Sequence, residues 1–229
     1  MNTLHSTYNW DYLDQKAYNN KVGIYKFKRQ FSFVVSNFAP KFGKILDVAG
    51  GSGRFALPLR VYTDQISVID INECALKILH DRDSSISIVC DDFMNIDFYE
   101  KYPSILCMEA LGYFPDWEAF FDKINTLLTD DGRIIISYQN PESWRFVLRK
   151  IWHWKKGPYA YKDMKLKEFK KLLLKCNLEI EEMEGMNWMP LPLSSNSIFV
   201  TFFEAIEKIF FQKNWYSQSP WLLISMKKS

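Results

Sequence analysis

The chain has 229 residues, of which 48% are hydrophobic and 17% aromatic, and a formal net charge of +2. This length and apolar content suit a single domain with a full core. No apolar run reaches the roughly 18 residues of a transmembrane helix, and the polar N-terminus lacks the layout of a signal peptide. We therefore expect a cytoplasmic protein without a transmembrane segment.

The predicted elements begin with helical spacing from Tyr8 to Phe38, ended by Ala39-Pro40. Strands and helices then alternate, and the turn Asp130-Asp131-Gly132 precedes the fifth strand. The predicted strands are Ile45–Ala49, Ile66–Asp70, Ile86–Cys90, Ile105–Met108 and Arg133–Tyr138, and the predicted helices are Arg54–Val61, Glu73–His80 and Asp116–Leu128. Apolar strands separated by helices predict a doubly wound parallel sheet with helices on both faces.

After Tyr138 the alternation pauses in Asn140–Asp163, which is rich in tryptophan and tyrosine and is predicted to be a lid-like insertion. The remaining predicted elements are a helix over Leu166–Cys176, a strand near Leu178–Glu184, a loop broken by two prolines, an amphipathic helix over Ile198–Phe211 and a strand over Trp221–Met226. The helix before the last strand is too apolar to face solvent on more than one side. Three explanations of its apolar surface remain open: burial, a homodimer face and peripheral membrane contact.

The four cysteines, Cys74, Cys90, Cys107 and Cys176, are widely spaced and lie inside predicted elements. This pattern predicts buried free thiols in a reducing compartment, with neither a disulfide framework nor a metal site.

Charge is distributed unevenly. Ten of the 29 Lys and Arg residues lie from Arg145 to Lys171, against two of the 27 acids, so this segment carries +8 and the rest of the chain −6. Three explanations of this basic segment remain open: a solvated helix face, a cradle for an anionic substrate, and contact with RNA or a membrane surface. The low overall charge disfavours a nucleic-acid partner.

A glycine-rich turn follows the first predicted strand, at Gly50-Gly51-Ser52-Gly53. Acids end three successive strands: Asp47 lies in the first, Asp70 ends the second, and Asp91-Asp92 follows the third. Because parallel strands end at the same sheet edge, these groups should line one site, where Asp70 could accept both hydroxyls of a ribose. The glycine spacing differs from G-x-G-x-x-G, which disfavours a dinucleotide.

These segments resemble the motifs of class I S-adenosylmethionine-dependent methyltransferases. Matching segments are Ile45–Gly53, Val68–Asn72, Val89–Phe93, Ile105–Phe114 and Leu127–Ile136, with Ala49 where the family most often has a glycine. The resemblance implies a Rossmann-like sheet of seven strands with the last antiparallel. It also implies one methyltransferase domain over 1–229: an N-terminal helical cap (1–40), a cofactor-binding core (41–139) and substrate-side insertions (140–164 and 187–219).

The same resemblance implies the roles of the cofactor-site residues. Asp70 would hold the ribose, and the backbone of the loop would lie against the methionine part of S-adenosylmethionine. The other implied cofactor-site residues are Asp47, Ala49, Gly50, Gly51 and Gly53 for the methionine part, Ile71, Asp92 and Phe93 for the adenine, and Met108 and Glu109 beside the sulfonium.

Methyl transfer to a hydroxyl requires a positioned acceptor and removal of a proton. His153, in the aromatic insertion, is the predicted base, with Glu109 and Tyr113 as alternatives. The predicted reaction is methylation of a small molecule, most simply at a hydroxyl of a sugar, a nucleotide-sugar or a secondary metabolite. An RNA or protein methyltransferase and a non-catalytic cofactor-binding subunit are the alternatives.

Overall fold

The structure is a computed structural model that describes residues 10–12, 15, 18–38, 40, 42–151, 164–192 and 194–229. Its centre is a seven-stranded sheet in the order β3-β2-β1-β4-β5-β7-β6. The strands are β1 (Ile45–Val48), β2 (Ile66–Asp70), β3 (Ser87–Cys90), β4 (Tyr102–Cys107), β5 (Leu128–Gln139), β6 (Leu178–Met186) and β7 (Trp221–Lys228). β7 runs antiparallel to both β5 and β6, while the other pairs are parallel, as expected.

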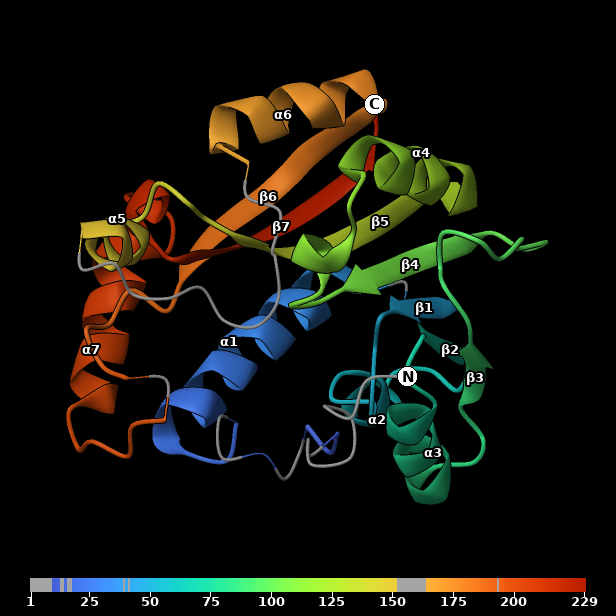
Figure 1. The fold of residues 1–229 in the computed structure, drawn as a ribbon, viewed down its shortest axis with the longest axis horizontal. Coiled ribbons are helices and arrows are strands. Elements are labelled where there is room, and N and C mark those ends of the chain that lie inside the picture. Colours follow the sequence, from blue (N-terminus) through green and yellow to red (C-terminus); the bar gives the residue numbers. More distant parts are fainter. Residues whose placement is uncertain are drawn as a thin grey trace.

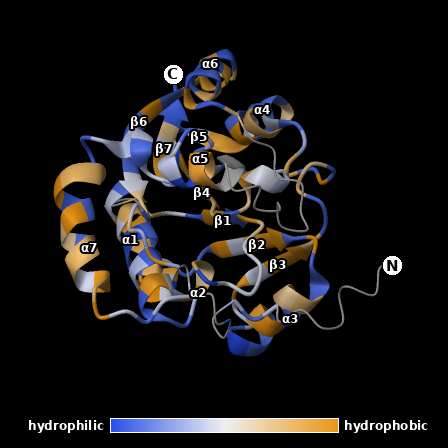
Figure 2. Ribbon diagram, turned by 60° about the vertical axis from the view of Figure 1, so that its left-hand side comes forward, coloured by the Kyte–Doolittle hydropathy of each residue, from blue (hydrophilic) through white to orange (hydrophobic). Residues whose placement is uncertain are grey.

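Helices cover both faces of the sheet (Figure 1). One face packs against α1 (Lys21–Phe38), α2 (Ala56–Leu59) and α3 (Glu73–Arg82), and the other packs against α4 (Trp117–Leu127) and α6 (Leu166–Lys175). Side chains of β4 and β5 alternate between the two cores, because successive strand residues point to opposite faces. Figure 2 shows the central strands as predominantly hydrophobic, as a sheet covered on both faces requires.

The remaining helical segments follow β4, β5 and β6 along the chain. They are α5 (Trp144–Ile151), α7 (Val200–Ile206), the π-helical turn η3 (Glu207–Phe211), and the short 3-10 turns η2 (Leu111–Tyr113) and η4 (Tyr216–Gln218). α7 packs on the outside of α1 through a small cluster of Val22, Tyr25, Met189 and Val200. No helix among the described residues is long and apolar enough to cross a membrane.

Three predicted boundaries were wrong. The N-terminal helix begins at Lys21 rather than near Tyr8, because Asn20 caps it by accepting a hydrogen bond from the Gly23 N–H at 3.0 Å. The helix expected over Arg54–Val61 shrinks to α2, since its Pro58 has no N–H to donate. The expected turn at Asp130–Gly132 lies inside β5, as a bulge between the paired positions Leu128 and Arg133.

The cysteine prediction was half wrong. All four thiols are free, but Cys74 and Cys90 are exposed, whereas Cys107 and Cys176 are buried. Cys74 is on the outer face of α3. Cys90 ends β3, which is an edge strand of the sheet and is covered less completely than the central strands.

Candidate functional site

The site lies where the sheet changes its direction of winding. β1 pairs with β2 on one side and with β4 on the other, so the loops after β1 and β4 diverge to opposite faces. Ligands of open α/β sheets bind in the crevice at this point. Both loops have strained backbone here: Ala49 has φ of 57° and Glu109 has φ of 60°, and neither is a glycine. Such left-handed residues often mark functional sites.

The glycine loop after β1 is packed so tightly that its glycines are required. A Cβ on Gly50 would lie 2.7 Å from Asp47 Cγ and 2.8 Å from Val68 Cγ1. Gly51 has φ of 55°, and its Cβ would meet the ring of Tyr12 at 2.6 Å. Neither position has room for a side chain, so glycine lets the loop backbone pass close to Asp47 and Tyr12.

Asp70 connects this loop to β2. Its Oδ2 accepts a hydrogen bond from the Gly51 N–H and its Oδ1 accepts one from the Asn72 N–H, both at 2.9 Å. Partial burial raises its pKa, although these amide donors oppose the shift. Ile71, the next residue, is 75% exposed and offers an apolar surface beside the carboxylate.

Asp47 is the most isolated acid of the site. Its carboxylate is buried, and Oδ2 has no hydrogen-bond partner among the described residues. Burial, helped by the nearby charge of Asp70, raises the pKa of Asp47 to about 7. An unpaired buried carboxylate gains from a nearby cation, so the site fits a positively charged ligand.

The acids and rings predicted for the adenine lie at the end of β3. Asp92 is exposed, and its Oδ1 accepts a hydrogen bond from the Met94 N–H at 2.9 Å, so it also caps the following turn. The ring of Phe93 is buried among other aromatic rings, including Phe120 at 5.6 Å between centroids.

Glu109 lies at the centre of a buried charged cluster, which we define as Tyr18, Lys26, Gln30, Arg54 and Glu109. Its carboxylate pairs with Lys26 Nζ at 2.8 Å and with Arg54 Nη1 at 2.7 Å. It also accepts hydrogen bonds from Gln30 Nε2 at 2.8 Å and from the Tyr18 hydroxyl at 3.2 Å. The two cations outweigh burial and hold the pKa of Glu109 well below its usual range.

This arrangement makes Glu109 a weak base, because its carboxylate is already held by four donors and stays ionised. Burial lowers the pKa of Lys26 and raises that of the Tyr18 phenol. Arg54 stacks on the Tyr18 ring, with Cζ 4.2 Å from its centroid. Its Nη2 is buried without a hydrogen-bond partner among the described residues, so the cluster keeps one donor for an additional acceptor.

The N-terminal segment covers the loop and the cluster. The Tyr12 N–H donates to Ser52 Oγ at 3.0 Å, and Asp11 pairs with Arg82 of α3. Tyr12 and Tyr18 lie edge to face, with ring centroids 6.0 Å apart. These contacts place the described N-terminal residues over the glycine loop, and the residues described before α1 are not helical.

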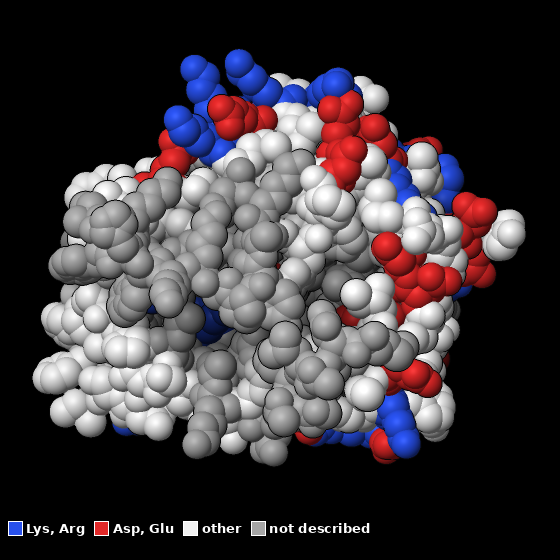
Figure 3. All heavy atoms as spheres, viewed as in Figure 1, with Lys and Arg blue, Asp and Glu red and all other residues white. Residues whose placement is uncertain are grey.

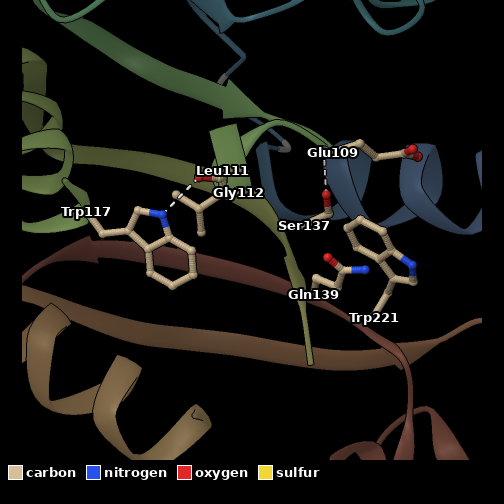
Figure 4. A pocket seen from close by; sticks show the side chains of 7 residues that line it. All are labelled: Glu109, Leu111, Gly112, Trp117, Ser137, Gln139 and Trp221. Atoms are coloured by element: carbon tan, nitrogen blue, oxygen red, sulfur yellow. Dashed lines mark hydrogen bonds between the residues drawn. The ribbon is translucent and has the colours of Figure 1, made fainter. Parts of the chain in front are cut away.

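A small cavity adjoins Glu109 on the side of β5 and β7, with a volume of about 10 Å³. Figure 4 shows the Trp117 and Trp221 rings on opposite sides of it. The other lining residues are Glu109, Leu111, Gly112, Ser137 and Gln139. The cavity has room for about one water molecule, so a larger ligand requires side chains at its wall to move.

Three further predicted site residues remain: the catalytic candidates Tyr113 and His153, and Met108, which was expected beside the sulfonium. Tyr113 is half exposed at the end of η2, on the loop that follows β4. Met108 is buried in the core directly before Glu109. His153 lies outside the described residues. No group of acids, histidines and cysteines among the described residues could hold a metal ion.

Sequence reasoning missed Tyr18, Lys26, Gln30 and Arg54. One signal was present in α1, because Lys26 and Gln30 follow Val22 at helical spacing and therefore lie on its apolar face. Arg54 directly follows Gly53 and could be taken for the first exposed residue of a helix.

Comparison with known proteins agrees with this geometry. A family profile described as a methyltransferase domain matches residues 22–183. The chain belongs to this methyltransferase family. S-adenosylmethionine is therefore its cofactor, and the buried Asp47 carboxylate, whose Oδ2 has no partner among the described residues, fits this cationic molecule.

The methyltransferase resembles curated proteins named ubiquinone biosynthesis O-methyltransferase. It is 28% identical to that of Thiobacillus denitrificans over 171 residues, which are 69% of this chain and 74% of the relative. It is 24% identical to that of Xanthomonas axonopodis pv. citri over 174 residues, which are 70% and 73% of the two chains.

Solved structures show the same fold at low sequence identity. An S-adenosylmethionine-dependent methyltransferase from Clostridium acetobutylicum has a TM-score of 0.64 at 14% identity and covers 89% of this chain and 92% of its own. Magnesium protoporphyrin IX methyltransferase from Synechocystis PCC 6803, solved with bound S-adenosylhomocysteine, has a TM-score of 0.66 at 14% identity, with 91% and 86% covered.

Proposed function

We propose that this methyltransferase acts on a hydroxyl oxygen of a small, ring-containing molecule. The observation that carries the proposal is the cavity between Trp117 and Trp221, which adjoins Glu109 just after β4 and is lined by Ser137 and Gln139 of β5. Aromatic walls favour flat or apolar rings over fully hydrated acceptors. The name of the curated relatives, O-methyltransferase, supports oxygen as the methylated atom. A sugar with an apolar ring face remains within this class of acceptor.

The cofactor would be held along the loops after β1, β2 and β3. In this proposal Asp70 binds the ribose, Ile71 and the Asp92–Phe93 loop hold the adenine, and the loop Ala49–Gly51 contacts the methionine part. The negative charge of the Asp47 carboxylate would then stabilise the positively charged groups of the cofactor. Arg54, which keeps a free donor, would bind the carboxylate of its amino-acid end.

S-adenosylmethionine supplies an activated methyl group when bound, so the protein mainly positions the acceptor. Glu109 would act by orienting Lys26 and Arg54 rather than by taking a proton, because its pKa is lowered. The two cations exceed this one carboxylate by one charge, which the carboxylate at the amino-acid end of the cofactor would neutralise. His153 remains our proposed base, with Tyr113 as the alternative.

The proposed compartment is the cytoplasm, where the exposed thiols of Cys74 and Cys90 remain reduced. We propose no nucleic-acid partner.

The experiment that tests the function is a methyl-transfer assay with matched phenol and aniline acceptors. We expect transfer to the phenol oxygen, and a Trp221→Ala variant should lose acceptor affinity while it still binds S-adenosylhomocysteine. Transfer to the aniline alone would contradict oxygen as the target. Full acceptor affinity in Trp221→Ala would contradict the proposed pocket.

A second assay separates the role of Arg54 from that of the nucleoside-binding loops. S-adenosylhomocysteine carries the amino-acid end, whereas 5′-methylthioadenosine lacks it. Arg54→Met should weaken binding of the first at least about tenfold and leave binding of the second unchanged, since a lost charge-assisted hydrogen bond costs about 1.5–3 kcal/mol. Equal losses for both ligands would indicate a structural role only.

A further inference from the structure

The cavity beside Glu109 contains a polar side chain that makes no contact of its own within the fold. Its lining includes a carboxyl, a hydroxyl and a carboxamide group, from Glu109, Ser137 and Gln139. The Glu109 carboxylate is held by its four donors, and Ser137 Oγ accepts a hydrogen bond from the Glu109 N–H. The Gln139 side chain has no hydrogen-bond partner among the described residues, and Figure 4 shows it beside the Trp221 ring. A carboxamide both donates and accepts hydrogen bonds, so this part of the wall can still bind a polar group.

The backbone that carries Gln139 is held on both sides. Gln139 is paired with Trp221 in the antiparallel ladder of β5 and β7. Tyr138, the residue before it, is buried in the core on the opposite face of the sheet. Asn140, the residue after it, donates its backbone N–H to the Pro220 carbonyl at 2.9 Å. Because its backbone is already fixed, the Gln139 side chain loses less conformational freedom when it binds a ligand.

The position of Gln139 along β5 indicates which part of an acceptor it would meet. Ser137 is bonded to the backbone of Glu109, and Gln139 lies two residues farther along the same face of the strand. Two residues of a strand extend about 7 Å, which is comparable to the span of a benzene ring with its substituents. With the sulfonium beside Glu109, as the family motifs imply, the methylated hydroxyl lies on that side of the cavity. Gln139 would therefore meet a group on the far side of the same ring.

The charges beside the cavity favour an uncharged group at this position. Lys26 Nζ lies 5.1 Å from the centre of the Trp221 ring, but it is paired with Glu109 at 2.8 Å. Gln139 itself is neutral, so an ionised substituent buried against it would have no free counter-ion among these residues. Burying an unpaired charge is costly, whereas a hydrogen-bonded neutral group can be buried at little cost. A carbonyl, carboxamide or hydroxyl substituent therefore fits better than a carboxylate or an ammonium group.

We infer that Gln139 is a specificity-determining residue that hydrogen-bonds a neutral polar substituent across the ring from the methylated hydroxyl. This inference rests on the proposed function and narrows its acceptor to a ring with two polar ends. Trp117 and Trp221 would enclose the apolar part of the ring, while the carboxamide selects which end faces the cofactor. An acceptor that lacks the second polar group leaves the carboxamide desolvated and unpaired, which disfavours that acceptor.

The test compares two neutral phenols with substituents of similar shape, para-hydroxybenzamide and para-isopropylphenol. We expect the ratio of their kcat/KM values, amide over isopropyl, to fall at least about threefold in Gln139→Met, as loss of one hydrogen bond predicts. Comparing this ratio between variants cancels the effect of each substituent on the acidity of the phenol. Gln65→Met is the matched control, because Gln65 is exposed before β2, at the opposite end of the strands, and the ratio should stay as in the wild type.

The outcomes separate the inference from the proposed function. A ratio that falls in Gln139→Met alone, with thermal unfolding and S-adenosylhomocysteine affinity unchanged, supports the inference. Methylation of both phenols in the same ratio by wild type and Gln139→Met, or an equal fall in Gln65→Met, would overturn the inference while the proposed function stands. Methylation of neither phenol by the wild type would contradict the proposed function, and the inference would fall with it.

Discussion

Glu109→Gln removes the carboxylate that lies between two buried cations. The side chains of Lys26 and Arg54 are each 8% exposed and within 2.8 Å of Glu109, so the variant leaves both positive charges without this partner. Breaking a buried ion pair by removing one member costs about 3–5 kcal/mol. For a domain of this size, each kcal/mol shifts Tm by about 2–4 °C, so Tm should fall by roughly 6–20 °C.

Urea unfolding and calorimetry measure this loss directly. Lys26→Met/Glu109→Gln is the informative companion variant, because it removes one cation together with the carboxylate and should be more stable than Glu109→Gln alone. The lowered pKa of Glu109 adds a pH signature. Its stabilising effect is complete at neutral pH and declines as pH falls below the ordinary pKa of a glutamate, a decline that Glu109→Gln should lack. A loss of less than about 1 kcal/mol would refute the reasoning.

Three further outcomes are expected. Burial raises the pKa of Asp47 to about 7, and a bound cation favours its ionised form. Affinity for S-adenosylmethionine should therefore rise from about pH 6 to about pH 8. Calorimetry of Asp47→Asn should show no such rise. Gly50→Ala should lower the free energy of unfolding, measured with urea, by about 1–3 kcal/mol, because its Cβ would lie 2.7 Å from the Asp47 carboxyl carbon. An unchanged free energy of unfolding would contradict that packing. Ellman's reagent should label two thiols in the native protein, Cys74 and Cys90, and all four after unfolding; prompt native labelling of a third would contradict their assigned burial.

The central fold could be predicted because its information is local. Apolar runs such as Ile134-Ile135-Ile136 are buried on both faces, and glycines, acids and helix caps mark where each strand ends. α4 illustrates this, since Asp116 was the expected start and its carboxylate caps the helix through the amides of Glu118 and Ala119. The glycine loop and Asp70 were likewise adjacent as expected, because parallel strands end at one edge.

The charged cluster could not be predicted, because its contacts are long-range. Lys26 and Glu109 are 83 positions apart in the sequence, and helix surfaces commonly carry lysines that face solvent. Residues before α1 looked helical from their spacing, but among the described ones Tyr12 bonds to Ser52 of the glycine loop and is not helical. The exposed side of α7 was a similar case, since periodicity shows that a helix is amphipathic but does not show which apolar stripe is covered.

Calorimetric titration with S-adenosylhomocysteine tests the central claim, that the loop after β1 and the acid ending β2 hold the cofactor. The account predicts one site per chain in the wild type and at least about tenfold weaker binding to Asp70→Ala, since Asp70 also anchors the Gly51 amide. Asp64→Ala, which removes an exposed acid before the same strand, should bind as the wild type does. Equal affinity in wild type and Asp70→Ala would contradict the account.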